Sequence, residues 1–591
     1  MTSSPNKLSQ FWQELKRRKV LRSLAIYAGT AFIILEAATI IFPRWGFPDW
    51  TIDLLLYLLI LGAFITFIIA WIYDITPGGV HKTKPEPEDQ EREILPESNA
   101  WKVATYISLV VIVAFIIFNI VPFNKLARVG TIDSVVILPF NNFTGDDQLD
   151  NMVSGMHSML IGDLGRVSRL RVISPTTANV YKDADMSVPE IASELGVNGV
   201  IDLDVMCLGD SVCLQVKVIS TYPEEKLLWI EDYKVEKSQI MNLYSQITKQ
   251  IADEVQIELS PEEEQRLAES RTVDPEALEA YLKGLSYSNQ FNVEKAKESF
   301  QLAIDKEPEW ADPYAGLANA WRLTWWIGLA PQNIALPEIY SYLNKAFELD
   351  PNSAYAYHIK ARTSVWTEWK WEQGEQAFLR SLELNPSDAI ARMYYSHLLM
   401  ILRRHDQAVT QAQLALELSP MEPFALFLYG NVMQEVGDYQ SAIEHFNKAL
   451  SIDPNARYVM GNLEGAYRAA GDYEKWIEIW KKIVCWDDDI KASIEKVLHE
   501  DGFVAAIEEL LKANEEFGKE GCQMHYMDKF DWYMELKEYE KALDNLEKLY
   551  EISFSNMPYM GTNRFYYEQL KTYPRYIALL EKMNLPLPEE D

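Results

Sequence analysis

The sequence predicts a chain of several domains, in which transmembrane helices are followed by a small α/β domain and then by an all-α solenoid of helical repeats. Three observations support this order. Three long apolar stretches occupy the first 125 residues, and short apolar strands alternate with helical patterns in the next part. Prolines then recur at nearly equal intervals through the second half. A chain of 591 residues is long enough for all three parts.

The first part is predicted to be a membrane region. Residues 20–42, 52–73 and 101–123 are apolar and long enough to cross the roughly 30 Å of hydrocarbon in a bilayer. Basic residues precede the first stretch and follow the second, so the positive-inside rule places residues 1–19 and the linker 74–100 in the cytoplasm. Three passes would then place the rest of the chain on the outer side of the membrane.

Glu36 is an ionisable residue inside the first apolar stretch. If the first two spans pack antiparallel, Tyr57 lies at the same depth, and Asn119 of the third span lies at a similar height. An intramembrane carboxylate suggests a functional role. The alternative is a protonated Glu that links the helices by a hydrogen bond. One acid without further polar residues cannot form a proton relay, which favours the packing role.

The α/β domain is predicted to span residues 131–260. Its expected elements, in order, are a strand at 134–140, a helix at 147–167, a strand at 170–174, a helix at 188–196, hairpin strands on either side of Gly209-Asp210, a strand at 226–235 and a helix that ends near Leu259.

Cys207 and Cys213 flank the predicted hairpin turn and raise the question of a disulfide. A two-residue turn at Gly209-Asp210 would oppose Cys207 to Val212 and direct Cys213 to the other face. A bulged three-residue turn would reverse this and bring the two thiols together. The alternation of apolar residues favours the first arrangement and leaves the second open.

Five prolines mark a repeat region at residues 275–488, with weaker copies expected at 489–591. Pro308, Pro351, Pro386, Pro420 and Pro454 lie 43, 35, 34 and 34 residues apart. Mostly small residues recur at fixed distances before them, where two antiparallel helices can approach closely, and proline ends the second helix. A period of 34 residues is typical of a helix-turn-helix repeat.

The best copy of this repeat is FALFLYGNVMQEVGDYQSAIEHFNKALSIDP, from Phe424 to Pro454. It resembles the tetratricopeptide (TPR) family, because the consensus residues of that family stand at Gly430, Gly437, Tyr439, Ala442, Phe446, Ala449 and Pro454. The resemblance implies a solenoid with an extended concave surface that binds proteins or peptides and rarely performs catalysis.

Tryptophans are concentrated at the start of the repeat region. The second repeat carries a nine-residue excess around TWWIGLAPQN, residues 324–333, and an insertion is expected to project from the solenoid. Two adjacent tryptophans on a helix cannot both face one core, and exposed aromatic anchors concentrate binding energy at interfaces. The tentative partner-binding residues are therefore Trp321, Trp325, Trp326, Trp366 and Trp369. The alternative is that most of them are buried in the repeat core.

The α/β region also resembles a known family. VVILPFNNFTGDD, LRVIS, ELGVNGVIDLDV, LGDSVCLQVKVIS and LLWIEDY are similar, in this order, to motifs of the TolB-like amino-terminal domain. The apolar first part, with AWIYDITPGGV at residues 70–80, resembles the membrane segment of bacterial proteins that carry such a domain with TPRs. Some of those proteins also carry an adenylate or guanylate cyclase domain, which is not recognisable here. The TolB-like family implies contacts with envelope proteins and no catalytic residues.

No catalytic, cofactor-binding or metal-binding motif stands out in the sequence. A net charge of −32 argues against nucleic acid as a partner. We therefore expect a non-enzymatic scaffold without cofactor, anchored in the inner membrane, whose periplasmic TolB-like and TPR domains bind envelope proteins. The alternative is a transmembrane signal-transduction receptor whose outer domains sense a ligand and signal to a cytoplasmic partner.

Overall fold

The computed structural model describes scattered residues between 27 and 82, and residues 132–588 with gaps at 147–148, 183, 223, 269–271, 518–525 and 564–565. The chain divides into two compact units, Met1–Val129 and Gly130–Asp591. Each unit is described by itself.

The first unit contains a short hairpin at the beginning of the predicted linker. Strands β1 (Tyr73–Thr76) and β2 (Gly79–Lys82) pair in antiparallel fashion. Elsewhere the Tyr27 hydroxyl donates a hydrogen bond of 2.8 Å to the Leu59 carbonyl. A Cβ atom on Gly62 would collide with the Tyr27 side chain, so the two helical segments that carry these residues lie close together.

The prediction of transmembrane helices is wrong for the part of the chain that the structure describes. No helix there is long and apolar enough to cross a membrane, whereas a span needs about 20 apolar residues in one helix. The inner-membrane anchor and the periplasmic position of the later domains depended on these helices, so both are withdrawn. Glu36, Tyr57, Asn119 and the stretch 101–123 lie outside the described residues.

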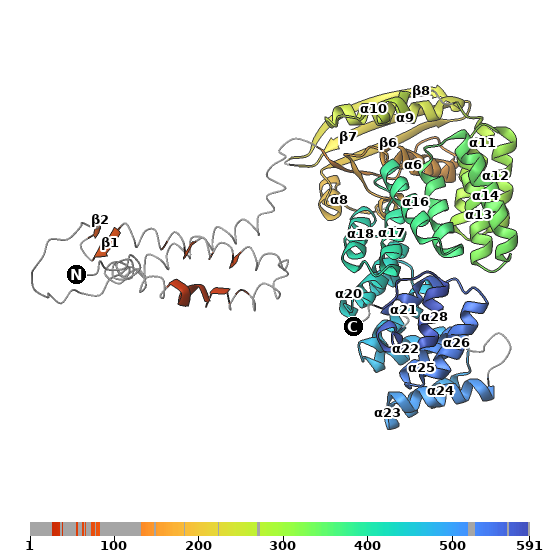
Figure 1. Ribbon diagram of the computed structural model, residues 1–591. Helices are drawn as coiled ribbons and strands as arrows, with labels where there is room; N and C mark the ends of the chain where they lie inside the picture. The colour runs from red at the N-terminus through yellow and green to blue at the C-terminus, as the bar shows by residue number, and fades with distance from the viewer. Residues whose placement is uncertain are drawn as a thin grey trace, which may run out of the picture. The chain divides into compact units, whose positions relative to one another are not determined.

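A six-stranded mixed sheet lies at the centre of the α/β part (Figure 1). Its strands are β3 (Ser134–Ile137), β4 (Asn141–Asn142), β5 (Arg171–Val172), β6 (Gly199–Leu208), β7 (Ser211–Ser220) and β8 (Lys226–Glu236). Strand β3 pairs in parallel with β5 and β6, and β4 also pairs with β6. Strands β6, β7 and β8 form an antiparallel meander.

Helices cover both faces of this sheet. They are α6 (Asp150–Leu164), α7 (Pro175–Asn179), α8 (Val188–Leu195) and α9 (Ile240–Glu254), and α10 (Pro261–Ala268) contacts α9. Val135 and Ile137 pack against α6 and α9, while Val136 packs against α7 and α8 on the opposite face. This alternation follows from the two-residue period of a strand. The small sheet domain expected from the sequence is therefore present, with α7 and β4 as additional elements.

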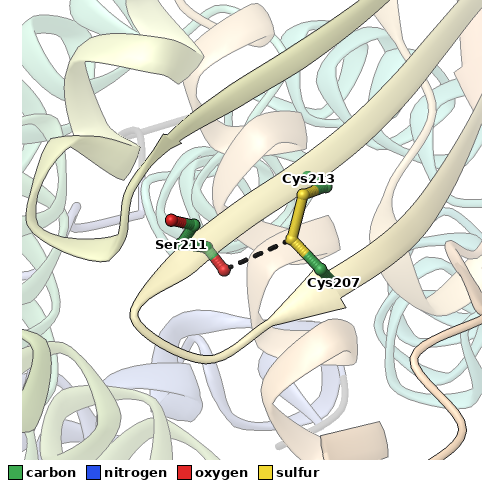
Figure 2. The surroundings of a disulfide bond; sticks show 3 residues. All are labelled: Cys207, Ser211 and Cys213. Atoms are coloured by element: carbon green, nitrogen blue, oxygen red, sulfur yellow. Dashed lines mark hydrogen bonds between the residues drawn. A yellow bond between two sulfur atoms is a disulfide. The ribbon is translucent and has the colours of Figure 1, made fainter.

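Cys207 and Cys213 form a disulfide, which corrects the favoured interpretation of the hairpin (Figure 2). Leu208 pairs with Val212, so the turn holds three residues instead of two. The register of the pair also shifts between Val205 and Cys207. A bulge adds one residue to one strand and reverses the facing of the residues beyond it. The thiols therefore meet, as in the alternative that the sequence left open.

Antiparallel helix pairs form the rest of the second unit (Figure 1). The first helices of the pairs are α11 (Pro275–Asn289), α13 (Ala311–Trp326), α15 (Ala354–Arg362), α17 (Ala389–Ile401), α19 (Pro423–Glu435), α21 (Arg457–Ala469), α23 (Asp488–Asp501) and α25 (Tyr526–Glu535). The second helices are α12 (Val293–Lys306), α14 (Gln332–Leu349), α16 (Trp371–Leu384), α18 (His405–Leu418), α20 (Tyr439–Ile452), α22 (Tyr473–Ile483), α24 (Phe503–Phe517) and α26 (Tyr539–Glu551). Each periodic proline follows a second helix, which confirms the all-helical repeat region.

The departures from a 34-residue period have visible causes. The interval from Pro351 to Pro386 contains one additional residue, and α15 continues into a π-helix, η3 (Thr363–Thr367). A π-turn holds one more residue than an α-turn, so it absorbs the insertion. The nine-residue excess of the second repeat mainly lengthens its helices. Helices α13 and α14 have 16 and 18 residues, against 13 and 14 in α19 and α20.

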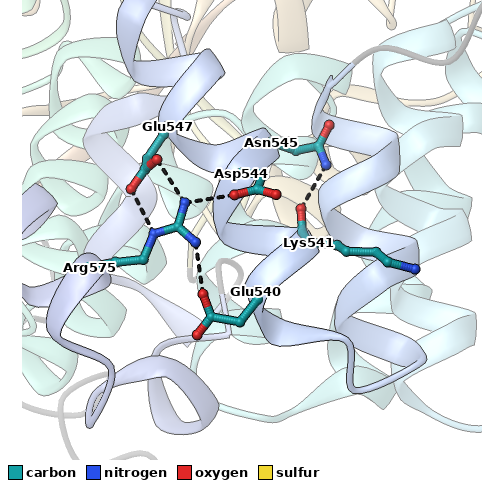
Figure 3. Close-up of polar contacts among 6 residues, drawn as sticks. All are labelled: Glu540, Lys541, Asp544, Asn545, Glu547 and Arg575. Carbon is teal, nitrogen blue, oxygen red and sulfur yellow. Dashed lines mark hydrogen bonds and ion pairs between the residues drawn. The ribbon is translucent and has the colours of Figure 1, made fainter.

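After α26 the chain continues through η4 (Met557–Gly561), α27 (Tyr567–Leu570) and α28 (Pro574–Lys582). Arg575 of α28 donates to three carboxylates on α26 (Figure 3). Two bonds of 3.0 and 2.8 Å reach Glu547, and bonds of 2.8 Å reach Glu540 and Asp544. These pairs are exposed to solvent, so they orient α28 more than they stabilise it.

The α/β part and the first repeats share one hydrophobic core. Met156 and Leu160 of α6 belong to the same buried cluster as Leu282, Phe300 and Trp310 of the repeats. Gly155 of α6 lies so close to α11 that a Cβ atom there would be 2.8 Å from the Leu282 side chain. The sheet domain is therefore packed on the beginning of the solenoid as part of one folded body.

Polar contacts extend this docking along the edge of the solenoid that carries the periodic prolines. The Val172 amide donates to Ser387 Oγ over 3.2 Å, and the Ser174 amide donates to the Leu418 carbonyl over 2.9 Å. The Ser174 and Ser419 hydroxyls are 2.7 Å apart. The turns that end two second helices thus hold the sheet domain through hydrogen bonds as well as through apolar packing.

The close approach of paired helices predicts the effect of adding one methyl group. A Cβ atom on Gly430 would lie 2.5 Å from the fully buried Phe446 ring, so Gly430→Ala should cost about 1–3 kcal/mol of unfolding free energy through overpacking. Gly461 is the matched control, because nothing lies within 4 Å of its Cβ position. There Gly461→Ala should stabilise helix α21 by up to about 1 kcal/mol. Urea unfolding of the two variants measures both effects, and equal effects would contradict the described packing.

Candidate functional site

The first helices of the repeats form the inner layer of the solenoid. Helix α11 contacts α13, α13 contacts α15, α17 contacts α19 and α19 contacts α21. The second helices α12, α14, α16, α18 and α20 instead pack on their own partners and on the next first helix. Repeat arrays of this kind present the inner layer as an extended concave binding surface. The inner layer is therefore the candidate binding surface.

The chain covers part of this inner layer with its own C-terminal segment, defined here as residues 557–563, 566 and 567. Trp366 Nε1 donates to the Tyr559 hydroxyl over 3.3 Å, and Arg403 donates to the Gly561 carbonyl over 3.1 Å. The Asn563 amide donates to Glu435 Oε1 over 3.1 Å. Further along, Arg468 donates to the Tyr566 hydroxyl. The segment thus runs along the inner layer from η3 to α21.

His397 fixes the direction of the hydrogen bonds at the centre of the segment. Its Nε2 lies 3.0 Å from the Leu428 carbonyl, which can only accept, so this nitrogen carries the proton. In the neutral ring Nδ1 is then an acceptor, and the Tyr559 hydroxyl donates to it over 2.9 Å. The Tyr559 oxygen in turn accepts a hydrogen bond from Trp366. All three side chains are thereby engaged in packing the segment.

An aromatic row remains beside the covered part of the inner layer. It consists of Tyr394, Phe424, Phe427 and Tyr458, from α17, α19 and α21. The ring centroids are 6.0 Å apart for Tyr394 and Phe424, and 5.9 Å apart for Phe424 and Tyr458. No ring contact or hydrogen bond joins the row to the described residues of the C-terminal segment. Tyr458 is 43% exposed, so the row offers an apolar surface to solvent.

Two arginines stand at one end of the aromatic row. Arg362 of α15 lies with its guanidinium carbon 3.9 Å above the Tyr394 ring and donates to the Tyr394 hydroxyl over 2.6 Å. Arg322 of α13 is only 5% exposed. Burial lowers the pKa of Arg322 to about 9, and the charge of Arg362 adds to this effect. The row is therefore aromatic along its length and cationic at one end.

A polar cavity of about 620 Å³ lies where the C-terminal segment meets the turns of two repeats. Its lining includes Arg403, His405, Glu435, Asn563 and Glu568. Burial, assisted by the charge of Arg403, lowers the pKa of His405. Several of its lining residues contact one another: the Asn563 backbone amide donates to Glu435, and Arg403 lies 3.6 Å from Glu568.

The tryptophans proposed from the sequence do not form one surface. Trp321 and Trp325 pack against a buried cluster between α13, α14 and α15. Trp326 is 47% exposed and lies 5.7 Å from the Phe291 ring. Trp366 packs under Tyr559, and Trp369 lies 5.7 Å from the Tyr550 ring. The expectation that Trp325 and Trp326 face different surroundings agrees with their positions.

Sequence reasoning missed the aromatic row and the arginine pair. One signal was available, because Phe424 and Tyr458 are 34 residues apart and so occupy the same place on successive repeats. The arginine pair gave no such signal. Arg322 and Arg362 belong to the two repeats with additional residues, where the helices are longer and the fixed spacing fails.

Comparison with known proteins agrees with this architecture. Residues 280–309 and 423–456 match the family described as Tetratricopeptide repeat. The chain contains tetratricopeptide repeats. Antiparallel helix pairs of the same kind lie between the two matched copies and follow the second one.

A curated protein and two solved structures are similar to parts of the chain. "Putative adenylate cyclase 3" of Rhizobium meliloti (strain 1021) is 25% identical over 239 residues, which are 39% of this chain and 40% of that protein. The chain thus matches less than half of that relative's length. YrrB, "a TPR protein with an unusual peptide-binding site", is 19% identical over 32% of this chain and 91% of its own, with a TM-score of 0.22. A thermophilic TPR protein of Thermus thermophilus is 16% identical over 32% of this chain and 98% of its own, with a TM-score of 0.28.

The different surroundings of the adjacent tryptophans predict opposite outcomes for two single substitutions. Trp325→Ala should lower the unfolding free energy by about 2–3 kcal/mol, because its ring packs on the cluster of α13 and α14. Trp326→Ala should change it by less than about 1 kcal/mol, because the ring is half exposed. Thermal melting of both variants measures the two losses of stability. A larger loss for Trp326→Ala would mean that Trp326, and not Trp325, is the packed ring.

Proposed function

We propose that the chain is a non-enzymatic protein-interaction scaffold whose aromatic row binds an extended segment of a partner protein. The observation that carries this proposal is the division of the inner layer. One part is filled by the chain's own C-terminal segment, while the row from Tyr394 to Tyr458 has no such contact among the described residues.

The chemistry of the row supports a peptide as its ligand. Aromatic side chains supply much contact area for little conformational entropy, and a few such anchors carry most of the energy at an interface. Tyr394, Phe424 and Tyr458 come from three successive first helices, so a partner must be extended to reach all of them. Because the C-terminal segment covers the neighbouring part of the inner layer, the aromatic row is the part that is left for such a peptide.

The division of the chain into domains is also part of this proposal. Residues 131–260 form a TolB-like domain, residues 275–488 form the TPR array, and residues 489–591 form degraded copies. The sheet with helices on both faces and the order of the sequence motifs support the first assignment. Its place in the scaffold is to extend the binding surface beyond the repeats.

The exposed side chains near Trp326 are a second proposed contact surface. Phe291, Trp326, Leu329 and Ile334 are all exposed and apolar. Trp326 ends helix α13, Phe291 lies in the turn between α11 and α12, and the two rings lie against each other. This surface is separate from the aromatic row, so the two can be tested independently.

A second candidate function is a signalling role, in which the chain responds to a ligand and regulates a catalytic partner. The similarity to a protein described as a putative adenylate cyclase favours it. A cyclic nucleotide formed by the purified full chain would instead make it an enzyme and overturn the scaffold proposal.

Site-specific photocrosslinking tests the scaffold proposal. A photoreactive amino acid in place of Tyr458, on the inner layer, should give one reproducible adduct with a partner protein in cells that produce the full chain. The same amino acid in place of Leu302, which is equally exposed on the outer helix α12, should give none. Adding Phe424→Ala should reduce the Tyr458 adduct at least tenfold, as expected for an anchor worth about 1.4 kcal/mol or more. Adducts at Leu302 alone would place the interface elsewhere.

A further inference from the structure

Arg322 is a buried cation whose hydrogen bonds are only partly satisfied. Its Nε and one terminal nitrogen donate to the same atom, Asn319 Oδ1, over 3.2 and 2.9 Å. A guanidinium group has five N–H donors and no acceptor. Among the described residues, Arg322 makes no ion pair with a carboxylate. Burial of a charge without a counter-ion lowers the stability of the folded chain.

Arg362 increases the charge instead of offsetting it. Its hydrogen bond and its ring contact both go to Tyr394, which is a neutral group. The positive charge of Arg362 repels that of Arg322, and both charges act on the Tyr355 hydroxyl. The inner layer therefore holds two like charges next to each other in the part of the chain that the structure describes.

Asp388 is the carboxylate near this pair, and it is already engaged. Its Oδ1 caps helix α17 by accepting from the Ala391 amide over 2.9 Å, and its Oδ2 lies 3.3 Å from His358 Nδ1. The other ring nitrogen of His358 is buried and has no hydrogen-bond partner among the described residues. Burial lowers the pKa of His358, so the ring is neutral near pH 7. Asp388 thus has its own partners, and among the described residues no carboxylate forms an ion pair with Arg322 or Arg362.

Two other buried arginines show how this chain compensates such a charge elsewhere. Burial would lower the pKa of Arg166, but Asp163, Asp312 and Asp350 outweigh it and raise the pKa above its ordinary value. Arg468 bonds to Glu535 and lies within ion-pair distance of Glu464 and Asp531. Several carboxylates thus offset the charge of each of these arginines. Arg322 differs from both, and it lies on the inner layer beside the aromatic row.

We propose that Arg322 and Arg362 bind a carboxylate of an acidic peptide segment, the remainder of which lies along the aromatic row. The proposal rests on the scaffold function and names the chemistry of its ligand. Guanidinium groups recognise carboxylates through paired hydrogen bonds of fixed geometry. A carboxylate is the anion that an unmodified peptide carries in Asp and Glu, whereas a phosphate, with nearly two negative charges near pH 7, requires phosphorylation. The aromatic row accepts the apolar side chains that follow.

A library of random 12-residue peptides captured by the full chain is the test. The wild-type chain should enrich peptides in which Asp or Glu stands beside apolar or aromatic residues. Arg362→Gln should bind the selected peptides at least tenfold more weakly, while Arg362→Lys should retain part of the affinity. Arg380→Gln, on the outer helix α16, is the control and should bind them as the wild type does.

Arg322→Met keeps the proposal testable if a loss of binding is suspected to reflect misfolding. Removing a buried, uncompensated charge should raise the melting temperature of the peptide-free chain, while binding of the selected peptides falls at least tenfold. Replacing their Glu by Gln should abolish the difference between wild type and variants. Replacing it by phosphoserine should weaken binding.

The remaining outcomes separate the two proposals. Enriched peptides without acidic residues, equal binding by Arg362→Gln and wild type, or tighter binding of phosphoserine peptides would overturn the carboxylate assignment and leave the scaffold function intact. If the wild type enriches no peptide and Tyr458 gives no crosslinked partner, both proposals fail.

Discussion

Every larger feature of this protein depends on how closely the two helices of a repeat approach each other. Ala296, Ala408 and Ala442 are almost fully buried at the crossings of the second helices, and Gly374 lies where a Cβ atom would collide with Val365. Side chains of this size allow tight antiparallel packing. The first helices then touch one another and become an inner layer. The aromatic row, the arginine pair and the contacts of the C-terminal segment all lie on that layer.

The packing at the two sides of the array gives it different properties. On the edge that carries the periodic prolines, the array binds the sheet domain through a shared hydrophobic core and through hydrogen bonds such as the one from the Ser174 amide to the Leu418 carbonyl. On the inner layer it holds the C-terminal segment, through His397 and Glu435. The uncovered part of the inner layer is the aromatic row, with the two arginines at one end. In a chain of net charge −32, such an end stands out as a site for an anion.

The repeats could be predicted because one local pattern, repeated five times, determines both the helix ends and the crossings. The succession of strands and helices along the sheet domain was predicted from short apolar runs and helical spacing. The disulfide was not predicted, because one bulged residue before Cys207 reverses the face of the strand and leaves the apolar alternation almost unchanged. The transmembrane helices were inferred from apolar length alone, and no described helix has that length.

The candidate site was harder to predict than the fold. Contacts such as that of Trp366 with Tyr559 join residues 193 positions apart, and no repeat period relates them. Arg322 and Arg362 are brought together by two repeats of irregular length. The tryptophans are numerous in this region, yet their rings lie in four different surroundings. The number of tryptophans therefore indicated a region of the sequence, and only the packing shows which side chains share a surface.

The central claim is that the C-terminal segment covers one part of the inner layer and leaves the aromatic row open. Hydroxyl-radical footprinting of the full chain, read by mass spectrometry, measures this directly. Tyr458 should be oxidised readily, because it is 43% exposed, whereas Tyr559, which is 7% exposed, should be protected. Rapid oxidation of Tyr559 together with protection of Tyr458 would contradict the account.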